Sequence, residues 1–133
     1  MNPHYTPVAL RAGHRCEYCH APEAVFNLPL EVEHILPIAC GGGDDAANWA
    51  LACRSCNLYK ATHTSGHDPV SEREVHLFHP REDRWEDHFI VAPESGELVG
   101  RTPIGRVTVM RLGLNSAAQV AARRQWMRLG LFP

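Results

Sequence analysis

Two pairs of cysteines constrain the fold of this chain more than any other feature of its sequence. Cys16 and Cys19 form one Cys-x-x-Cys pair, and Cys53 and Cys56 form a second pair with the same spacing. Two intervening residues let a tight turn present both sulfur atoms to one tetrahedral ion, and thiolate ligands favour zinc. Four thiolates would fill the coordination shell, so we predict a closed, structural zinc site.

Two other interpretations of these pairs are a thiol redox motif and cysteines buried as small apolar residues. Neither explains why both pairs share one spacing, so zinc is favoured. The fifth cysteine, Cys40, precedes three glycines and is interpreted as a bystander. The N-terminus does not resemble a signal peptide, and no apolar run approaches the ~20 residues that span a bilayer. We therefore expect a cytoplasmic protein without membrane association, in a compartment where thiols stay reduced.

The 33 residues between the two pairs exceed the gap of an ordinary zinc ribbon, which indicates an inserted functional element. Residues 31–38 are β-branched and apolar enough for a strand. A glycine-rich loop follows at 40–45, and the short apolar stretch from Asn48 to Ala52 suits a return strand or turn. Residues 53–63 are predicted to form a helix that begins at the second thiol turn.

Proline and glycine positions mark the elements outside this insertion. A short helix is predicted near residues 6–13, and residues 64–75 are expected to be a polar loop. A β-hairpin is predicted over 88–99, and helices over 103–112 and 116–129. Together these elements predict an α+β fold: a core at residues 1–63, and an extension at residues 64–133 packed on the same domain.

The net charge of −2 argues weakly against nucleic acid, but its distribution is uneven. Residues 61–100 carry nine acidic and three basic side chains, whereas residues 101–133 carry six arginines and no acid. Such a basic end is typical of a phosphate-binding face. The alternative is a basic helical surface that docks on the acidic middle of the chain, and charge alone does not separate the two.

The residues between the cysteine pairs carry a more specific pattern. In order they are a glutamate-histidine pair, the glycine loop, an asparagine before an apolar stretch, and an asparagine and a lysine after the last cysteine: Glu33, His34, Asn48, Asn57 and Lys60. This string resembles the HNH endonuclease motif (the His-Me finger) in its zinc-bound, four-cysteine form. The third letter of that motif is usually histidine; here it is Asn57, which gives an HNN variant.

The resemblance implies a ββα-metal core and a role for each matching residue. His34 is the expected general base that takes a proton from the attacking water, and imidazole suits that task near neutral pH. Glu33 and Asn57 are the expected ligands of a catalytic Mg²⁺ or Mn²⁺ ion, because their oxygen atoms suit hard cations. Asn48 is expected to hold the loop that orients His34, and Lys60 to contact the substrate phosphate.

Further phosphate contacts are expected from basic residues outside the motif, namely His63, Arg106, Arg123 and Arg124. The remaining histidines show no paired spacing and are interpreted as structural. The first functional hypothesis is therefore an endonuclease that hydrolyses DNA, with RNA as a further substrate. The alternatives are a zinc-stapled nucleic-acid-binding module without catalysis and a thiol redox protein. Taken singly, each site residue also has an ordinary interpretation: a hydrogen-bonded strand histidine, a solvated glutamate or a turn asparagine.

Overall fold

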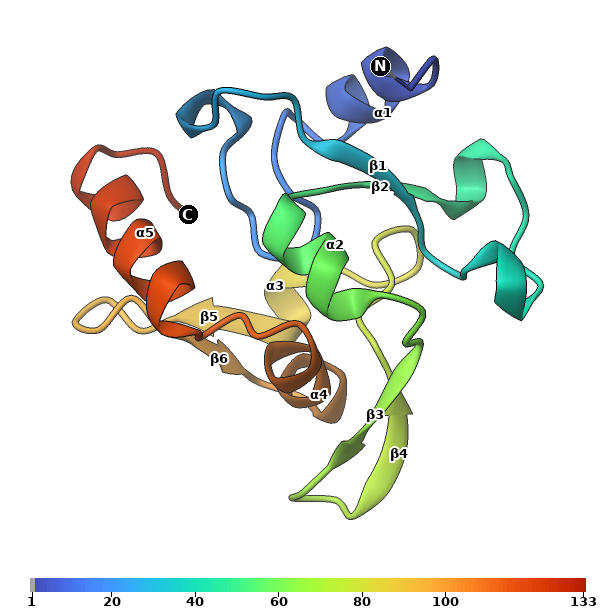
Figure 1. Cartoon of the computed structure of the whole chain (residues 1–133). Coiled ribbons are helices and arrows are strands. Elements are labelled where there is room, and N and C mark those ends of the chain that lie inside the picture. The colour runs from blue at the N-terminus through green and yellow to red at the C-terminus, as the bar shows by residue number, and fades with distance from the viewer. Residues whose placement is uncertain (1) are drawn as a thin grey trace.

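The computed structural model describes residues 2–133 and confirms the α+β class: short helices pack among three small antiparallel hairpins (Figure 1). No helix within residues 2–133 is long and apolar enough to cross a membrane. The elements in chain order are α1 (Tyr5–Arg11), η1 (Glu23–Val25), β1 (Glu31–His34), η2 (Ile38–Cys40), η3 (Ala46–Asn48), β2 (Trp49–Ala52), α2 (Arg54–Lys60), β3 (Ser65–Asp68), β4 (Arg73–His76), α3 (Trp85–His88), β5 (Phe89–Val91), β6 (Leu98–Gly100), α4 (Pro103–Arg111) and α5 (Ala117–Arg128).

The inserted element folds as two strands and a helix. β1 and β2 pair antiparallel with Glu33 opposite Ala50 and His34 opposite Trp49. α2 begins directly after Cys53, whose sulfur accepts a hydrogen bond from the Cys56 N–H at 3.5 Å. The helix is shorter than predicted because Ala61 adopts a φ of 47°, a left-handed conformation that ends the helical path. α2 packs against β1, which gives the ββα arrangement.

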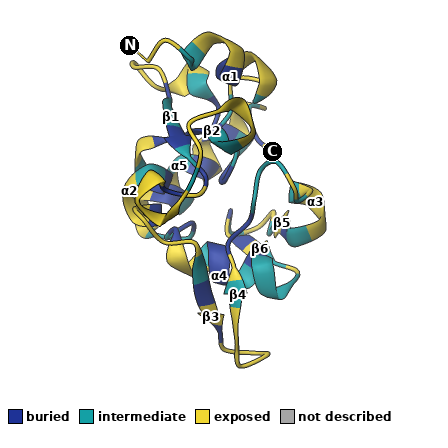
Figure 2. Cartoon of the chain, turned by 90° about the vertical axis from the view of Figure 1, so that its right-hand side faces the viewer, coloured by how far each residue is buried: buried dark blue, intermediate teal, exposed yellow. Residues whose placement is uncertain are grey.

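The core is formed by both halves of the chain. The side of α1 that carries Val8 and Ala9 is buried, and the helix packs on β2. Leu51 from β2 and Leu98 from β6 are both buried in the same apolar cluster. Figure 2 shows buried residues concentrated in the strands and the inner faces of the helices, with exposed residues on the outer loops.

The extension contains the predicted hairpin and both predicted helices. β5 pairs with β6, and α4 is capped by Thr102, whose side chain accepts a hydrogen bond from the Gly105 N–H at 3.0 Å. Gly105 is required here because a Cβ atom would lie 2.0 Å from the His88 carbonyl oxygen. α5 is capped in the same way by Ser116, whose hydroxyl accepts a hydrogen bond from the Gln119 N–H.

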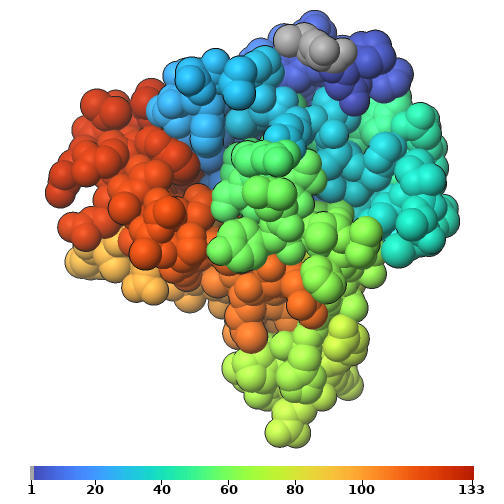
Figure 3. Space-filling model, in the orientation of Figure 1, coloured from blue at the N-terminus to red at the C-terminus, as the bar shows by residue number. Residues whose placement is uncertain are grey.

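Residues 64–75 were expected to be a loop, and that prediction is wrong because β3 and β4 form a third hairpin there. Asp68 ends β3 and accepts hydrogen bonds from the N–H groups of Val70 and Ser71, which shapes the turn. The same carboxylate binds Arg106 of α4 through two contacts of 2.9 and 3.0 Å. β3 packs against α4 at the base of the hairpin. The outer part of the hairpin projects from the body, so its strands can be polar (Figure 3). Helix α3 was also not predicted.

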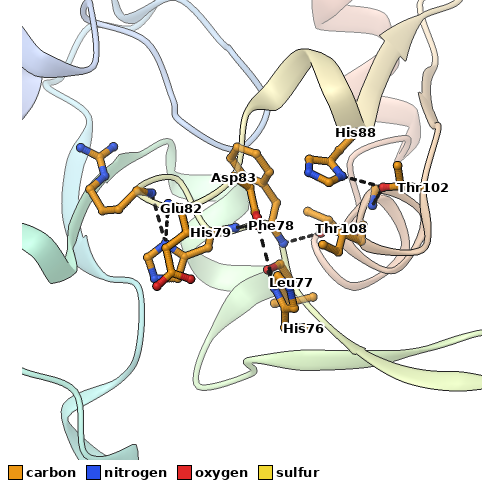
Figure 4. A network of polar contacts seen from close by, with 12 residues as sticks. His76, Leu77, Phe78, His79, Glu82, Asp83, His88, Thr102 and Thr108 are labelled. Carbon is orange, nitrogen blue, oxygen red and sulfur yellow. Dashed lines mark hydrogen bonds and ion pairs between the residues drawn. The ribbon is translucent and has the colours of Figure 1, made fainter.

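A network of polar contacts fixes the segment between β4 and α4 (Figure 4). The Phe78 N–H donates to the Thr108 hydroxyl at 2.8 Å, and His88 Nδ1 lies 2.6 Å from the Thr102 hydroxyl. His79 Nδ1 accepts from the N–H groups of Arg81 and Glu82. The histidines of this segment therefore have local partners, in agreement with their structural interpretation.

Candidate active site and metal centre

The four paired cysteines converge on one point. Their sulfur atoms all lie within 4.8 Å of one another, and all four side chains are buried. The sulfurs of Cys19 and Cys53 lie 3.7 Å apart, far longer than the ~2.05 Å of a disulfide bond. Two tight turns supply the ligands: the loop after α1 and the start of α2.

This cluster fits a structural zinc ion. Burial raises the pKa of the Cys16 thiol, whereas hydrogen bonds from Cys16, Cys19 and Cys56 lower the pKa of Cys53. The four buried thiols therefore differ in how readily each loses its proton. One cation that displaces the protons and binds all four thiolates would stabilise them together. The ion would bridge the loop before β1 to α2 and so brace the ββα element. Cys40 lies apart from the cluster and is exposed.

His34 lies at the end of β1 on the strand face opposite to Glu33, because side chains alternate along a strand. Its imidazole is partly open to solvent, with 35% of the side chain exposed. The Nε2 atom lies 2.9 Å from Oδ1 of Asp44. Hydrogen bonds from His34 and from the Trp49 indole lower the pKa of Asp44, so its carboxylate is ionised at neutral pH and accepts from Nε2–H.

The loop that follows His34 is held by Asn48. The side-chain amide of Asn48 accepts from the Leu36 N–H at 2.8 Å and donates to the carbonyl oxygens of Leu36 and Gly43 at 2.8 and 2.7 Å. The Asn48 carbonyl also accepts from the Ile35 N–H at 2.8 Å. One side chain thus joins both ends of the glycine loop and fixes the backbone that carries Asp44 toward His34.

Glu33 and Lys60 form a buried ion pair beneath His34. Lys60 Nζ lies 3.0 Å from Oε2 of Glu33 and 3.1 Å from the carbonyl oxygen of His34. Lys60 is 1% exposed and Glu33 is 7% exposed. The second oxygen of Glu33 accepts a hydrogen bond from the hydroxyl of Tyr18, which lies between the two cysteines of the first pair. Burial raises the pKa of Glu33 above its ordinary value, and Lys60 opposes this effect.

These contacts differ from the predicted cation site. Asn57 does not face Glu33: its amide nitrogen donates to Oε1 of Glu31 at 2.6 Å. Glu33 is occupied by Tyr18 and Lys60, so the two predicted ligands do not form a pair that fits a hard cation. The expectation that Lys60 contacts a phosphate is corrected for the same reason. Its ammonium group is buried, because α2 packs its Lys60 face onto the strand that carries Glu33.

The predicted phosphate contacts also separate into two groups. His63 and Arg124 are exposed. Arg106 is committed to the Asp68 carboxylate, with 29% of its side chain exposed. Arg123 is fully buried, with 0% exposure, which excludes a direct contact with a substrate. The amphipathic pattern of the last helix did not reveal this, because an arginine between apolar positions is usually a surface residue.

Sequence reasoning missed two residues that contact the predicted site residues, namely Asp44 and Tyr18. Asp44 lies in the glycine-rich loop, where an acidic residue is an ordinary turn residue. Tyr18 lies between Cys16 and Cys19, and the segment was interpreted only as a source of zinc ligands. The sequence signal that could have identified them is their position: Tyr18 precedes Cys19, and Asp44 directly follows the three glycines.

Comparison with protein-family models gives a match over part of the chain. Residues 16–62 match the family model described as HNH endonuclease. The matched range begins at the first cysteine of the zinc cluster and includes Glu33, His34, Asn48, Asn57 and Lys60. The comparisons with curated proteins and with solved structures find no match.

Proposed function

On the premise that residues 16–62 form an HNH endonuclease domain, we propose that this protein hydrolyses phosphodiester bonds of nucleic acid with His34 as its general base. The observation that carries the proposal is the His34–Asp44 pair at 2.9 Å, on a loop that Asn48 holds. Nucleases of this family act on nucleic acid, and we take DNA as the substrate, with RNA to be tested beside it.

Asp44 determines which imidazole nitrogen of His34 can accept a proton. Because the Asp44 carboxylate accepts the Nε2 hydrogen, the neutral ring carries its lone pair on Nδ1. We propose that Nδ1 takes the proton of a water molecule as its oxygen attacks phosphorus. The bond from phosphorus to the departing sugar oxygen breaks in the same displacement, and a solvent water protonates that oxygen. The ionised carboxylate then stabilises the imidazolium that forms, as a carboxylate does in other histidine-carboxylate pairs. Asp44 would thus be a positioning residue for the base.

The buried pair beneath His34 has a supporting role in this proposal. Lys60 binds the His34 carbonyl oxygen and Glu33 together, and so fixes the end of β1 from the interior side. Dependence on Mg²⁺ or Mn²⁺ remains a prediction, because the expected ligands Glu33 and Asn57 do not converge in the described arrangement. No step proposed here passes through that ion.

A nucleic-acid strand would approach beside the loop that follows His34. A hollow of about 260 Å³ lies next to this loop, lined by Ile35 and Leu36 on one side and by His76 and His79 on the other. We propose that His63 and Arg124, which are exposed, add phosphate contacts at the surface. Arg124→Gln should weaken DNA binding a few-fold for all sequences and reduce the salt dependence by about one phosphate contact. Equal binding and an equal salt slope would show that Arg124 does not contact phosphate.

A nicking assay on supercoiled plasmid tests the main proposal. Zinc-loaded wild-type protein should convert the plasmid to open-circular or linear form, with Mg²⁺, Mn²⁺ and EDTA reactions run in parallel. His34→Ala, purified identically, controls for contaminating nucleases. If His34→Ala cuts as fast as the wild type, the assignment of the base is wrong. Stoichiometric zinc that survives the EDTA reaction would exclude the thiol redox alternative.

The charge pair of Asp44 provides a second, finer test. Asp44→Asn keeps a hydrogen-bonding side chain but removes the charge, and should lower kcat by about tenfold or more with little change in KM. Asp45→Asn is the matched control, since Asp45 is the neighbouring acid and contacts the Ala47 N–H rather than His34. The ¹⁵N shifts of His34 should report Nε2–H in the wild type. A ring protonated on Nδ1 instead would contradict the proposed role.

A zinc-stapled binding module without catalysis is the second candidate. The buried contact between Glu33 and Lys60 favours it, because this contact occupies a predicted cation ligand. The two functions separate in the same assay: a module would shift DNA in a gel and leave the plasmid intact under all three ion conditions.

A further inference from the structure

Trp49 is a partly buried aromatic residue that the proposed reaction does not use. It is the first residue of β2 and lies directly opposite His34 in the register of the two strands, so both side chains lie on the same face. Its indole N–H donates to Oδ1 of Asp44 at 3.1 Å. Nε2 of His34 lies 2.9 Å from that same oxygen, so one carboxylate oxygen joins the two cross-strand neighbours.

The Asp44 side chain needs a second contact to keep its direction. It is 67% exposed, and a single pair between exposed groups is weak because water competes with it. Asn48 holds the backbone of the loop through the carbonyl oxygens of Leu36 and Gly43, but a backbone contact does not set the rotamer of a neighbouring side chain. The indole of Trp49 supplies the second donor from a strand, which is a more rigid element than the loop.

Helix α1, which packs on β2, holds Trp49 in turn (Figure 1). The Arg11 guanidinium donates to the carbonyl oxygens of Trp49 at 2.6 Å and of Ala46 at 2.8 Å. His4 directly precedes α1, and its ring stacks on the indole with the ring centres 3.9 Å apart and the planes 23° from parallel. Both residues precede the matched range 16–62, so the position of the indole depends on contacts from outside that range.

We propose that Trp49 is a positioning residue for the base: its indole N–H fixes the Asp44 carboxylate, which holds the His34 ring with Nε2 protonated and Nδ1 free. The effect on cleavage rests on the proposed nuclease function, whereas the protonation of the ring can be measured without it. An aromatic residue beside a nuclease site could instead stack on a nucleobase. Stacking on substrate predicts a raised KM, and positioning of the base predicts a lowered kcat.

Trp49→Phe tests the proposal, because it keeps an aromatic ring on the strand and removes the N–H donor. In the plasmid assay kcat should fall about three- to tenfold, while KM stays within about twofold of the wild type. An unchanged kcat in the folded variant, or a raised KM with kcat unchanged, would overturn the proposal.

Trp85→Phe is the matched control. The Trp85 indole also donates one hydrogen bond, to the Tyr18 carbonyl oxygen at 2.9 Å, and its ring also stacks on a histidine, His20, with the ring centres 3.9 Å apart. It bonds Tyr18 rather than Asp44, so kcat of zinc-loaded Trp85→Phe should stay within about twofold of the wild type. Circular dichroism would establish that both variants are folded. Equal losses of kcat in the two variants would indicate a general effect of tryptophan replacement and overturn the proposal.

A double-mutant cycle with Asp44→Ala separates positioning from a loss of packing. If Trp49 acts through the Asp44 carboxylate, Trp49→Phe should lower kcat by less than about twofold once that carboxylate is absent. The same three- to tenfold loss in both backgrounds would show that Trp49 acts by another route, and the proposal would fail.

NMR tests the arrangement without cleavage. The ¹⁵N shifts of His34 should report Nε2–H in the wild type and a larger fraction of Nδ1–H in Trp49→Phe. If Trp49→Phe does not fold, Asp44→Ala at its exposed site should move the Trp49 indole N–H signal upfield, and an unmoved signal would overturn the proposal. A wild type that shows these signals but leaves DNA intact would refute the nuclease function and support the arrangement. A wild type that cuts DNA, with the same His34 tautomer in Trp49→Phe, would refute the role of Trp49 alone.

Discussion

The two faces of strand β1 differ in what surrounds them, although their residues are adjacent in sequence. On one face Glu33 is buried against Lys60 and Tyr18. On the other face His34 is partly open to solvent and contacts Asp44, a loop residue that is itself exposed. The strand thus separates an interior charge pair from a candidate reactive group by a single peptide unit.

A short strand can therefore contribute to stability through one face and to chemistry through the other. A buried ion pair resists the loss of either partner, because the remaining charge would be unpaired in the interior. A solvent-facing histidine has no such constraint and can exchange protons. Substitutions on the inner face should therefore change stability, and substitutions on the outer face should change cleavage.

The largest effect is expected from His34→Ala on the outer face. Removal of the general base should lower the cleavage rate by about 10²- to 10⁴-fold, while the Tm and the zinc content stay at wild-type values. Plasmid nicking and thermal unfolding measure the two quantities. A large fall in Tm would show that His34 belongs to the structural face, and the comparison would fail.

On the inner face, Lys60→Met should remove about 3–5 kcal/mol from the free energy of unfolding, since Glu33 is left buried without a partner. Arg54→Met on the same helix is the matched control: its pair with Glu31 is exposed, at 3.3 Å, and should contribute at most about 1 kcal/mol. Denaturant titration measures both variants. Equal losses would contradict the distinction between buried and exposed pairs.

Asn48→Ala tests the glycine-rich loop between β1 and β2, which carries Asp44 to His34. The structure offers a close control, because Asn115 binds the N–H and carbonyl of Leu98 at 2.8 Å each, as Asn48 binds Leu36. Both alanine variants should lose about 1–3 kcal/mol of stability. Only Asn48→Ala should lower cleavage, by about 100-fold, because only its loop orients Asp44 and His34. Comparable losses of cleavage would show a general effect of stability.

The smallest effect is expected from Tyr18→Phe. Loss of the hydroxyl leaves one oxygen of Glu33 without its donor in the interior, which should cost about 1–3 kcal/mol. Tyr5→Phe, whose hydroxyl contacts Glu23 at a partly buried site, should cost less. Urea unfolding of the zinc-loaded proteins measures the difference. A greater loss for Tyr5→Phe would indicate that the inner face tolerates the unpaired oxygen.

Much of the fold was predictable because its signals are local. Thr102 with Pro103, and the pair Asn115 and Ser116, indicated where the last two helices begin. The side chains of Thr102 and Ser116 make the capping hydrogen bonds. The hairpin at Ser65–His76 was not predictable, since its strands are polar and its stability comes from α4 and from Asp68 contacting Arg106. Such a contact joins residues 38 positions apart and leaves no periodic pattern in either segment.

The sequence by itself determined the four-cysteine cluster, because fixed spacing is a property of the chain alone, and its resemblance to the HNH motif implied the ββα order and the candidate base. The tertiary structure decided which charges face water. It placed Lys60 and Arg123 in the interior, left His34 and Arg124 at the surface, and brought Asp44 to His34. Burial and partnership depend on how distant segments pack, and no local pattern of residue types specifies them.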